Sequence, residues 1–291
     1  MLKLEKVSKD YGNGKGVKNI SFQISRGKVC ALLGHNGCGK TTTFRLLLGL
    51  LKEDEGYIYY DKEILDRSNY RLFGYIPEER SLLRGLSVEE HVFYLARLKK
   101  MEDPEIENAF TYWLKFLQIE QYRKSKIVEL SKGNQQKVQI LCALIHNPEV
   151  IIFDEPLNGL DIDNLEIFKR LLVKLKNDKK IILISSHQYQ NIEPFCEQVV
   201  YLSEGNIVLK GDIHKMKMKS SKRILTIKTK KELFKKEEGI ISSIKEKEYQ
   251  VIEVENKQIG YTLIQKLIEL QIEQFKMELI PLSMIIKEKV V

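Results

Sequence analysis

The chain has 291 residues, of which 43% are hydrophobic and 30% are charged. These proportions suit one large core or two smaller ones, and they exclude a disordered, collagen-like or low-complexity protein. No apolar run reaches the roughly 18 residues that a membrane-spanning helix needs. The formal net charge is +8, and ten Lys or Arg against the single acid Glu232 fall within residues 215–236. This basic segment suits an anionic membrane surface, a nucleic acid or a solvated connector.

The N-terminal residues and the cysteines indicate the compartment. Residues 1–6 contain neither a continuous apolar stretch nor a small-residue cleavage site, so we expect no secretory signal and a cytoplasmic protein. The four cysteines, at positions 30, 38, 142 and 196, have no CxxC or metal-ligand spacing. We therefore expect reduced thiols rather than a disulfide framework.

Up to about residue 210, short apolar segments alternate with helical ones, which is typical of a parallel α/β sheet. The predicted strands are residues 29–33, 74–76, 150–153 and 181–185. Between the second and third strands, Ser87 and Glu90 form a capping box for a helix ending near residue 98. Asp103 and Pro104 provide the N-cap and first-turn proline of another helix, ending near residue 118. We therefore expect a helical insert at about residues 81–127.

After residue 211 the composition shifts to Lys, Ile and Glu in short alternating segments. They predict a strand, a helix, two strands, a helix and a strand, which is the split βαβ, or ferredoxin-like, layout. These elements are expected at residues 224–229, 231–237, 240–244, 250–254, 261–270 and 275–280. The expected organisation is an α/β domain of residues 1–212, a basic connector of residues 213–222 and a small α+β domain of residues 223–291.

The predicted strand at residues 29–33 is followed by a glycine-rich loop, residues 34–42, and then by a helical run. The pattern GxxxxGK[ST] arises by chance in roughly one chain in a hundred of this length. Its glycines let consecutive N–H groups surround an anion at the start of a helix. Lys40 supplies a cation for the β- and γ-phosphates, and the Thr41 hydroxyl can bind Mg²⁺. The loop therefore predicts a nucleoside triphosphate site, in which the helix N-terminus is expected to favour the thiolate of Cys38.

A second acidic motif follows the predicted strand at residues 150–153. Asp154 at the end of this strand can hold the hydration shell of Mg²⁺, and Glu155 can accept a proton from water attacking the γ-phosphate. An Asp-Glu pair after a strand is common and often inert by itself. Together with the phosphate loop it indicates hydrolysis of the triphosphate.

Between these motifs stands Leu-Ser-Lys-Gly-Asn-Gln-Gln-Lys at residues 130–137, with Ser131 in N-cap position for a helix ending near residue 146. Here the chain resembles the ATP-binding subunits of ABC transporters, whose signature reads LSGGQ. The resemblance covers residues 1 to about 210 and rests on several motifs in the same order. It implies a P-loop ABC ATPase fold with a helical subdomain, and ATP and Mg²⁺ as ligands.

The resemblance also implies residue roles. It makes Glu155 the general base, His187 the switch histidine at the γ-phosphate, and Lys40 the phosphate-binding lysine. Tyr11 matches the aromatic residue that stacks on adenine, and residues 158–161 match the D-loop. The implied nucleotide contacts are Tyr11, Gly34, His35, Asn36, Gly37, Cys38, Gly39, Lys40, Thr41, Thr42, Glu78, Ser131, Gly133 and Asp161. The implied Mg²⁺ ligands are Thr41, Asp154 and Glu78.

Some positions depart from the family pattern. Lys132 replaces the first signature glycine and Asn134 the glutamine, whereas Ser131 and Gly133 remain to contact the γ-phosphate. Glu78 stands where the family usually has glutamine, and its added negative charge is expected to alter nucleotide affinity or Mg²⁺ dependence. The segment at residues 74–80 resembles the subgroup that serves ABC-2 exporters of sodium, drugs or peptides.

The family resemblance implies a head-to-tail dimer, with a second copy or a related subunit, in which each ATP lies between the phosphate loop of one chain and the signature of the other. It also implies integral membrane permease subunits, docked on the helical insert near Glu78, and a location on the cytoplasmic face of the membrane.

The alternative is a non-transport ABC ATPase acting on a ribosome, a nucleic acid or an assembly complex. The translation factors of that class carry two cassettes, and its DNA-repair members carry a long coiled coil. The roughly hundred residues between the two Walker motifs leave room only for a compact insert. We therefore expect transport, no nucleic-acid partner, and anionic lipid near residues 215–236.

Overall fold

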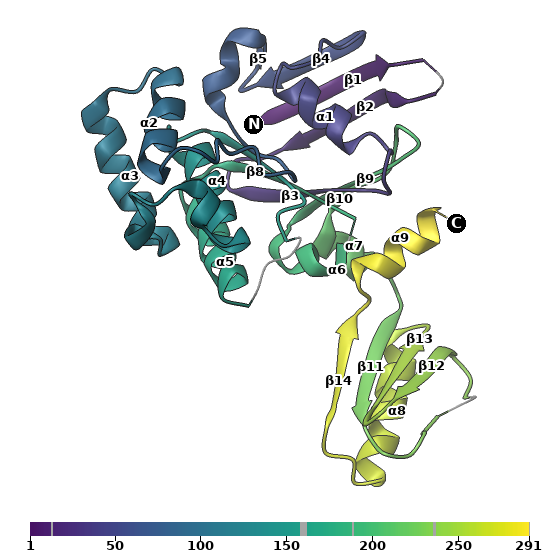
Figure 1. The fold of residues 1–291 in the computed structure, drawn as a ribbon. Coiled ribbons are helices and arrows are strands. Elements are labelled where there is room, and N and C mark those ends of the chain that lie inside the picture. Colours follow the sequence, from purple (N-terminus) through teal and green to yellow (C-terminus); the bar gives the residue numbers. More distant parts are fainter. Residues whose placement is uncertain (13, 158–161, 188, 235–236, 291) are drawn as a thin grey trace. The chain divides into compact units, whose positions relative to one another are not determined.

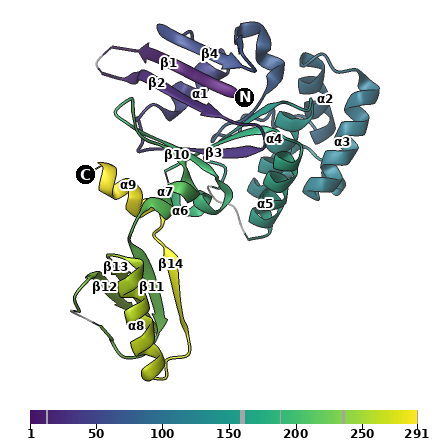
Figure 2. The same ribbon diagram turned by 180° about the vertical axis from the view of Figure 1, so that it is seen from behind.

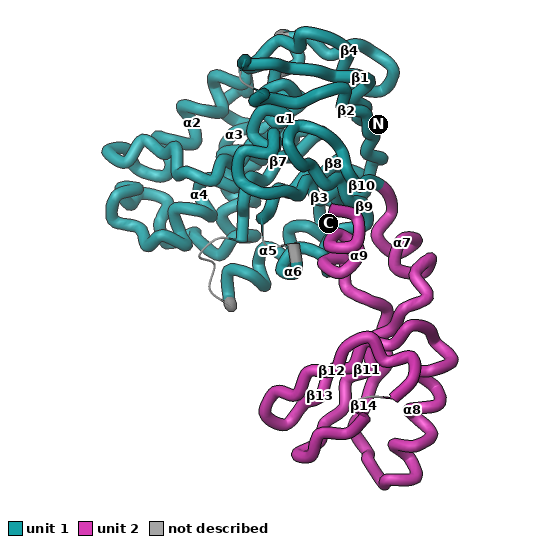
Figure 3. The backbone as a smooth tube through the Cα atoms, turned by 90° about the vertical axis from the view of Figure 1, so that its right-hand side faces the viewer, with its two compact units in different colours: residues 1–210 teal, residues 211–291 magenta. Residues whose placement is uncertain are grey.

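The computed structural model describes residues 1–290 apart from residues 13, 158–161, 188 and 235–236. The chain divides into two compact units, residues 1–210 and 211–291 (Figure 3). Within the described residues, none of the helices combines the length and apolarity required to cross a membrane.

The first unit contains two sheets. The larger sheet has six strands, and its members β3, β6, β7, β8 and β9 run parallel where their pairing is defined. In sheet order the strands are β10 (Asn206–Asp212), β9 (Gln198–Ser203), β3 (Lys28–Leu33), β8 (Ile181–Ser186), β7 (Val150–Asp154) and β6 (Phe73–Ile76). All residues of β7 and β8 are buried, because both faces of this sheet are covered. The four strands predicted in this region are confirmed.

A smaller antiparallel sheet, which the sequence analysis did not predict, precedes and follows the phosphate loop in the chain. Its order is β2 (Gly16–Ile24), β1 (Leu2–Asp10), β4 (Glu55–Tyr60) and β5 (Glu63–Ile64). In Figures 1 and 2, α1 (Lys40–Leu47) lies between this sheet and the larger one. Phe44 of α1 is fully buried in a core that takes Leu4 from the small sheet and Ile152 and Leu183 from the large one.

Helices cover the remaining faces and join the strands. Between β6 and β7 lie α2 (Val88–Leu98), α3 (Asp103–Leu117) and α4 (Lys132–Leu144), which pack on one another. The capping box of Ser87 and Glu90 is confirmed. The N-cap of α3, however, is Glu102, so Asp103 is the first helical residue rather than the cap. The other helical segments are η1 (Arg67–Leu72), η2 (Glu120–Tyr122), η3 (Ile127–Glu129), α5 (Ile162–Asn177), α6 (Tyr189–Ile192) and η4 (Glu193–Phe195).

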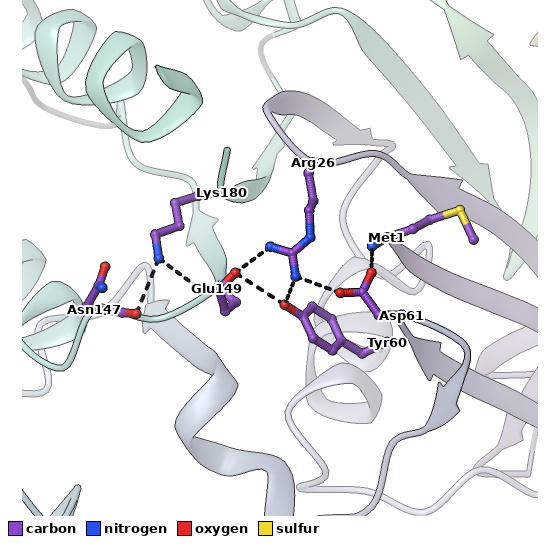
Figure 4. Close-up of polar contacts among 7 residues, drawn as sticks. All are labelled: Met1, Arg26, Tyr60, Asp61, Asn147, Glu149 and Lys180. Carbon is purple, nitrogen blue, oxygen red and sulfur yellow. Dashed lines mark hydrogen bonds and ion pairs between the residues drawn. The ribbon is translucent and has the colours of Figure 1, made fainter. Parts of the chain in front are cut away.

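A polar network ties the two sheets together at the amino ends of β7 and β8 (Figure 4). Arg26, in the turn before β3, pairs with Asp61 at the end of β4 and with Glu149 before β7. Glu149 also accepts a hydrogen bond from Lys180 at 3.0 Å. Burial opposes ionisation of Glu149, but hydrogen bonds from Arg26 and Lys180 outweigh it and lower the pKa of its carboxyl. The network therefore holds the amino ends of these strands. The Asp154 and Glu155 motif lies at the opposite, carboxyl ends.

The second unit contains α7 (Ile213–Lys219), β11 (Arg223–Lys228), β12 (Ile240–Glu246), β13 (Tyr249–Val254), α8 (Lys257–Glu269), β14 (Phe275–Leu279) and α9 (Leu282–Val290). Its antiparallel sheet has the order β12-β13-β11-β14, with α8 packed on β11 and β13 and α9 packed on α7.

The helix predicted at residues 231–237 is wrong for the described part of that range. Phe234 adopts a left-handed conformation, with φ of 54°, which ends any helix there. Leu233 instead donates its N–H to Gln250 Oε1 at 2.7 Å and packs on the small core. The buried amide of Gln250, distant in sequence, thus holds this segment in an irregular path.

Candidate active site

The phosphate loop closes on its own lysine. Lys40 is buried, and its Nζ donates to the carbonyl oxygens of Gly34 at 2.7 Å and His35 at 3.2 Å. Gly34 and Gly39 have φ values of 147° and 112°, and a Cβ on Gly34 would lie 2.3 Å from the carbonyl oxygen of Leu202. Backbone conformation and lack of space therefore both require glycine, and the loop wraps around the start of α1.

Strand register places the loop beside the acidic motif. In the parallel sheet, Leu33 of β3 is paired with Ser186 of β8, and Asp154 of β7 is paired with Ser185. The carboxyl ends of β3 and β7 therefore lie on either side of the carboxyl end of β8, at the same end of the sheet. Gly34 and Glu155 each follow their strand at this end of the sheet, so these two motifs, 121 positions apart in the chain, meet there.

A serine that the sequence analysis missed organises the two acids. Ser185 is fully buried, and its Oγ donates to Asp154 Oδ1 at 2.5 Å while accepting the N–H of Glu155 at 2.9 Å. Tyr75 of β6 donates its hydroxyl to the other Asp154 oxygen at 3.2 Å. Burial, followed by the Asp154 charge, raises the pKa of Tyr75 well above its usual value, so its hydroxyl remains a donor. The one sequence signal for Ser185 was a hydroxyl near the end of an otherwise apolar strand.

The structure brings Glu155 and His187 together, as their predicted roles require. Nδ1 of His187 lies 3.0 Å from Oε1 of Glu155. The Glu155 carboxylate is buried whereas the His187 side chain is 41% exposed. Glu155 also has φ of 51°, a conformation that a non-glycine residue adopts only when its surroundings hold it.

Glu78 is exposed on the loop after β6, and a glutamine holds that loop in place. Gln139 of α4 donates its amide to the carbonyl oxygens of Pro77 at 3.0 Å and Glu79 at 3.2 Å. Gln136, one helical turn before it, donates to the carbonyl oxygen of Pro156 at 2.7 Å. Helix α4 therefore connects the Glu78 loop with the segment after Glu155, a role that the sequence did not reveal.

The signature residues lie at the start of α4, which packs on α2, α3 and β6, whereas the phosphate loop opens α1, which packs on β2. Ser131 is the N-cap, as predicted, and accepts the N–H of Asn134 at 3.3 Å. A Cβ on Gly133 would lie 2.4 Å from the amide nitrogen of Asn164 in α5, so this position admits only glycine without rearrangement.

The other predicted contacts are peripheral or undescribed. Tyr11 is 48% exposed in the turn after β1, where its N–H donates to Lys15. Residues 158–161, including the predicted contact Asp161, lie outside the described residues. Cys38 is buried rather than accessible, and the expectation of a favoured thiolate is wrong because burial raises the pKa of its thiol more than the Lys40 charge lowers it.

The donor set at the acidic motif suits magnesium. The Thr41 hydroxyl and the Asp154 carboxylate are hard oxygen donors. In the part of the chain that the structure describes, no three His, Cys, Asp or Glu side chains gather to hold a metal by themselves. A cation at this edge therefore requires further oxygens, and Mg²⁺ commonly takes them from the phosphates of a nucleotide.

Comparison with known proteins identifies the family. The profile of the family described as ABC transporter matches residues 17–158. A relative from Methanocaldococcus jannaschii, an uncharacterised ABC transporter ATP-binding protein, is 42% identical over 212 residues, which are 73% of this chain and 78% of the relative. The chain belongs to the ABC transporter ATP-binding subunits. It is an ATP-binding and ATP-hydrolysing cassette, with the P-loop α/β fold of that family and a β-rich C-terminal region.

Further similarities support this assignment. YhaQ, an uncharacterised ABC transporter ATP-binding protein of Bacillus subtilis, is 40% identical over 243 residues, or 83% of this chain and 82% of YhaQ. The lantibiotic transport ATP-binding protein SrtF of Streptococcus pyogenes is 30% identical over 212 residues, or 73% of this chain and 91% of SrtF. A solved ATP-binding subunit of an ABC transporter superposes with a TM-score of 0.69 at 30% identity, covering 75% of this chain and 92% of that one. A dimeric bacterial cassette superposes with a TM-score of 0.65 at 29% identity, covering 73% of this chain and 99% of that one.

Proposed function

We propose that this cassette drives export through separate membrane-spanning subunits by hydrolysing ATP. The observation that carries the hydrolytic assignment is the continuous set of contacts from His187 through Glu155 and Ser185 to Asp154, beside the phosphate loop. The export direction is supported by the similarity to SrtF, whose name assigns it to lantibiotic transport.

Each residue of this set has a definite task in the proposal. Glu155 accepts a proton from water as the water oxygen bonds to the γ-phosphorus, and the bond from that phosphorus to the bridging oxygen of ADP breaks. His187 orients the Glu155 carboxylate and contacts the γ-phosphate. Lys40 stabilises the negative charge on the β- and γ-phosphates. Thr41 and Asp154, with Glu78 nearby, would hold Mg²⁺, which supplies positive charge to the phosphate oxygens.

We further propose a head-to-tail dimer in which Ser131 and Gly133 of one chain face the phosphate loop of the other. Support comes from the separate positions of α4 and α1 in the fold and from the dimeric form of a related cassette. In this arrangement Tyr11 stacks on adenine, and Asp161 contacts the site from the D-loop. The N-terminus of α4 favours a negative charge, and the γ-phosphate of ATP supplies that charge. Closure of the dimer therefore depends on ATP.

A pocket beside the site suits a permease segment. It has a volume of about 360 Å³ and lies among β6, α2, α4 and the residues that follow α1, next to the loop of Glu78. Leu50 and Leu98 line it and are 64% and 57% exposed, so apolar surface is accessible there. We propose that a segment of the membrane partner fills this pocket, which would place the cassette at the cytoplasmic face of the membrane.

For the C-terminal part we propose a separate domain, residues 223–291, joined to the ATPase domain of residues 1–212 by the basic stretch at 213–222. Its strand order, β12-β13-β11-β14, matches a split βαβ fold in which the first helix is replaced by an irregular segment.

Replacement of Glu155 by glutamine tests the hydrolytic assignment. Glu155→Gln should bind ATP within about twofold of the parent, lose at least 100-fold in hydrolysis, and accumulate as an ATP-bound dimer. ATPase assays and light scattering with ATP and Mg²⁺ measure these outcomes. Glu166→Gln, on the exposed face of α5, is the matched control and should behave as the parent. Hydrolysis by Glu155→Gln at the parental rate would remove Glu155 from the role of base.

A further inference from the structure

Tyr75 stands between the pocket and the acidic motif. It belongs to the edge strand β6, where it pairs with Ile152 of β7, two residues before Asp154. Side chains two positions apart on a strand share a face, so Tyr75 and Asp154 project from the same side of the sheet. Its hydroxyl reaches Asp154 Oδ2 at 3.2 Å, while the residue also lines the pocket.

The Asp154 carboxylate is held from two directions. Ser185 of β8 donates to Oδ1 at 2.5 Å, and Tyr75 of β6 donates to Oδ2. Each carboxylate oxygen has two acceptor positions, so one position on each oxygen stays available for a ligand. Two donors from the strands on either side of β7 restrict rotation of the buried carboxylate, which lies at the carboxyl end of β7.

We propose that Tyr75 is a positioning residue, which orients Asp154 for a divalent cation. This proposal rests on the role that the proposed function gives to Asp154. Hydrogen bonds to metal-binding carboxylates typically change metal affinity by about 10- to 100-fold when they are removed. Because Ser185 continues to hold Oδ1, loss of the Tyr75 hydroxyl belongs at the lower end of that range. A merely structural role predicts instead that the aromatic ring alone is sufficient.

Tyr75→Phe separates these two roles, because it keeps the ring and removes only the hydroxyl. The concentration of Mn²⁺ that half-saturates the ATP-containing cassette, followed by electron paramagnetic resonance, should rise about 10-fold. Binding of ATP in EDTA should not change, because no cation is involved. ATPase activity should fall at low Mg²⁺ and return towards the parental kcat at high Mg²⁺.

Tyr60→Phe is the matched control. Tyr60, in β4 of the smaller sheet, also has a hydrogen-bonded hydroxyl, which contacts Arg26 and Glu149 near the amino end of β7. This variant should keep the parental Mn²⁺ affinity. If Tyr75→Phe also keeps it, Tyr75 has no positioning role.

Asp154→Asn distinguishes failure of this inference from failure of the proposed function. Parental Mn²⁺ affinity in Asp154→Asn would overturn the assignment of Asp154, and the inference with it. Weakened cation binding in Asp154→Asn but not in Tyr75→Phe would overturn the inference alone. Weakened binding in both variants, with ATP binding in EDTA retained, is the expected result.

Discussion

Cys38 shows how one position in the phosphate loop combines opposing effects. The helix N-terminus and Lys40 favour its thiolate, but burial of the side chain disfavours the charge more strongly. Its sulfur fills the space beside Gly34, where an added Cβ would approach it to 2.4 Å. The Cys38 side chain therefore serves as a small packing group within the phosphate loop.

The buried thiol should resist alkylation. In the native protein at pH 8, iodoacetamide should modify Cys38 at least about 10-fold more slowly than in urea, because only the exposed thiolate reacts. Mass spectrometry of the peptide containing residue 38 measures the rate. Modification at equal rates in the two conditions would contradict the burial of this thiol. In Cys38→Ser protein treated in the same way, this peptide should stay unmodified, which assigns the signal to the Cys38 thiol.

At the scale of elements, α4 links several parts of the site. Its N-cap is a signature residue. Gln136 donates to the segment after Glu155, and Gln139 donates to carbonyl oxygens on both sides of Glu78. Gln135 donates to the carbonyl oxygen of Leu130 at 3.1 Å. Any displacement of the helix changes both loops at the same time. This is how occupation of the neighbouring pocket would affect hydrolysis under the proposed function.

His146, just after α4, should make the stability of the protein sensitive to acid. Burial, assisted by the charge of Lys99, lowers the pKa of His146 to about 4, and Nε2 of the neutral ring lies 3.1 Å from the carbonyl oxygen of Phe73. Between about pH 6.5 and pH 4 the unfolded chain therefore binds more protons at this residue than the folded chain. Stability consequently rises with pH across this window and is lost as the pH falls, by on the order of 1–2 kcal/mol after allowance for solvent screening.

His146→Gln should make the free energy of unfolding less dependent on pH between 6.5 and 4, since an amide can still donate to Phe73 without titrating. Urea unfolding followed by the fluorescence of Trp113, the chain's single tryptophan, reports on the first unit. His35→Gln, at an exposed position of the first unit, is the control and should keep the parental slope. An unchanged slope in His146→Gln would show that another group causes the acid sensitivity.

At the scale of the whole molecule, the basic segment at residues 215–236 differs from a uniform run of free charges. Lys222 lies 3.1 Å from Glu253 and 2.5 Å from Glu288, so its charge is compensated inside the second unit. Lys215 and Lys219 occupy one exposed face of α7 together with Met218, which is 55% exposed. Lysines beside an exposed methionine suit an anionic lipid surface, and we propose that contact for this segment.

Replacement of Lys215, Lys219, Lys230 and Lys231 by glutamine should weaken binding of the full chain to phosphatidylserine-containing vesicles at least about tenfold in low salt, with ATPase activity unchanged. Vesicle sedimentation measures this effect. Four exposed lysines of the first unit, at positions 62, 115, 124 and 179, provide a charge-matched control. Equal loss in both variants would indicate a net-charge effect alone, and salt-sensitive RNA binding that is lost only in the first variant would favour nucleic acid.

The sequence by itself determined the phosphate loop, the acidic pair and the capped start of α4. Each of these is a contiguous motif, in which glycine conformation, a strand end or an N-cap acts over a few residues. The strands at the centre of the large sheet were equally clear, because burial on both faces makes them continuous apolar runs. The small antiparallel sheet was not predicted, since β-bulges interrupt the alternation along β1.

Only the tertiary structure decided which side chains serve these motifs. Ser185, Tyr75 and Gln139 lie on different strands and helices from the groups that they bind, and nothing in their local sequence specifies the partner. The same is true of Gln250, which replaces a predicted helix by an irregular segment through a contact 17 residues away. Local propensity is a weak preference that one buried hydrogen bond can outweigh, because an unsatisfied amide in the core is more unfavourable than a lost turn of helix.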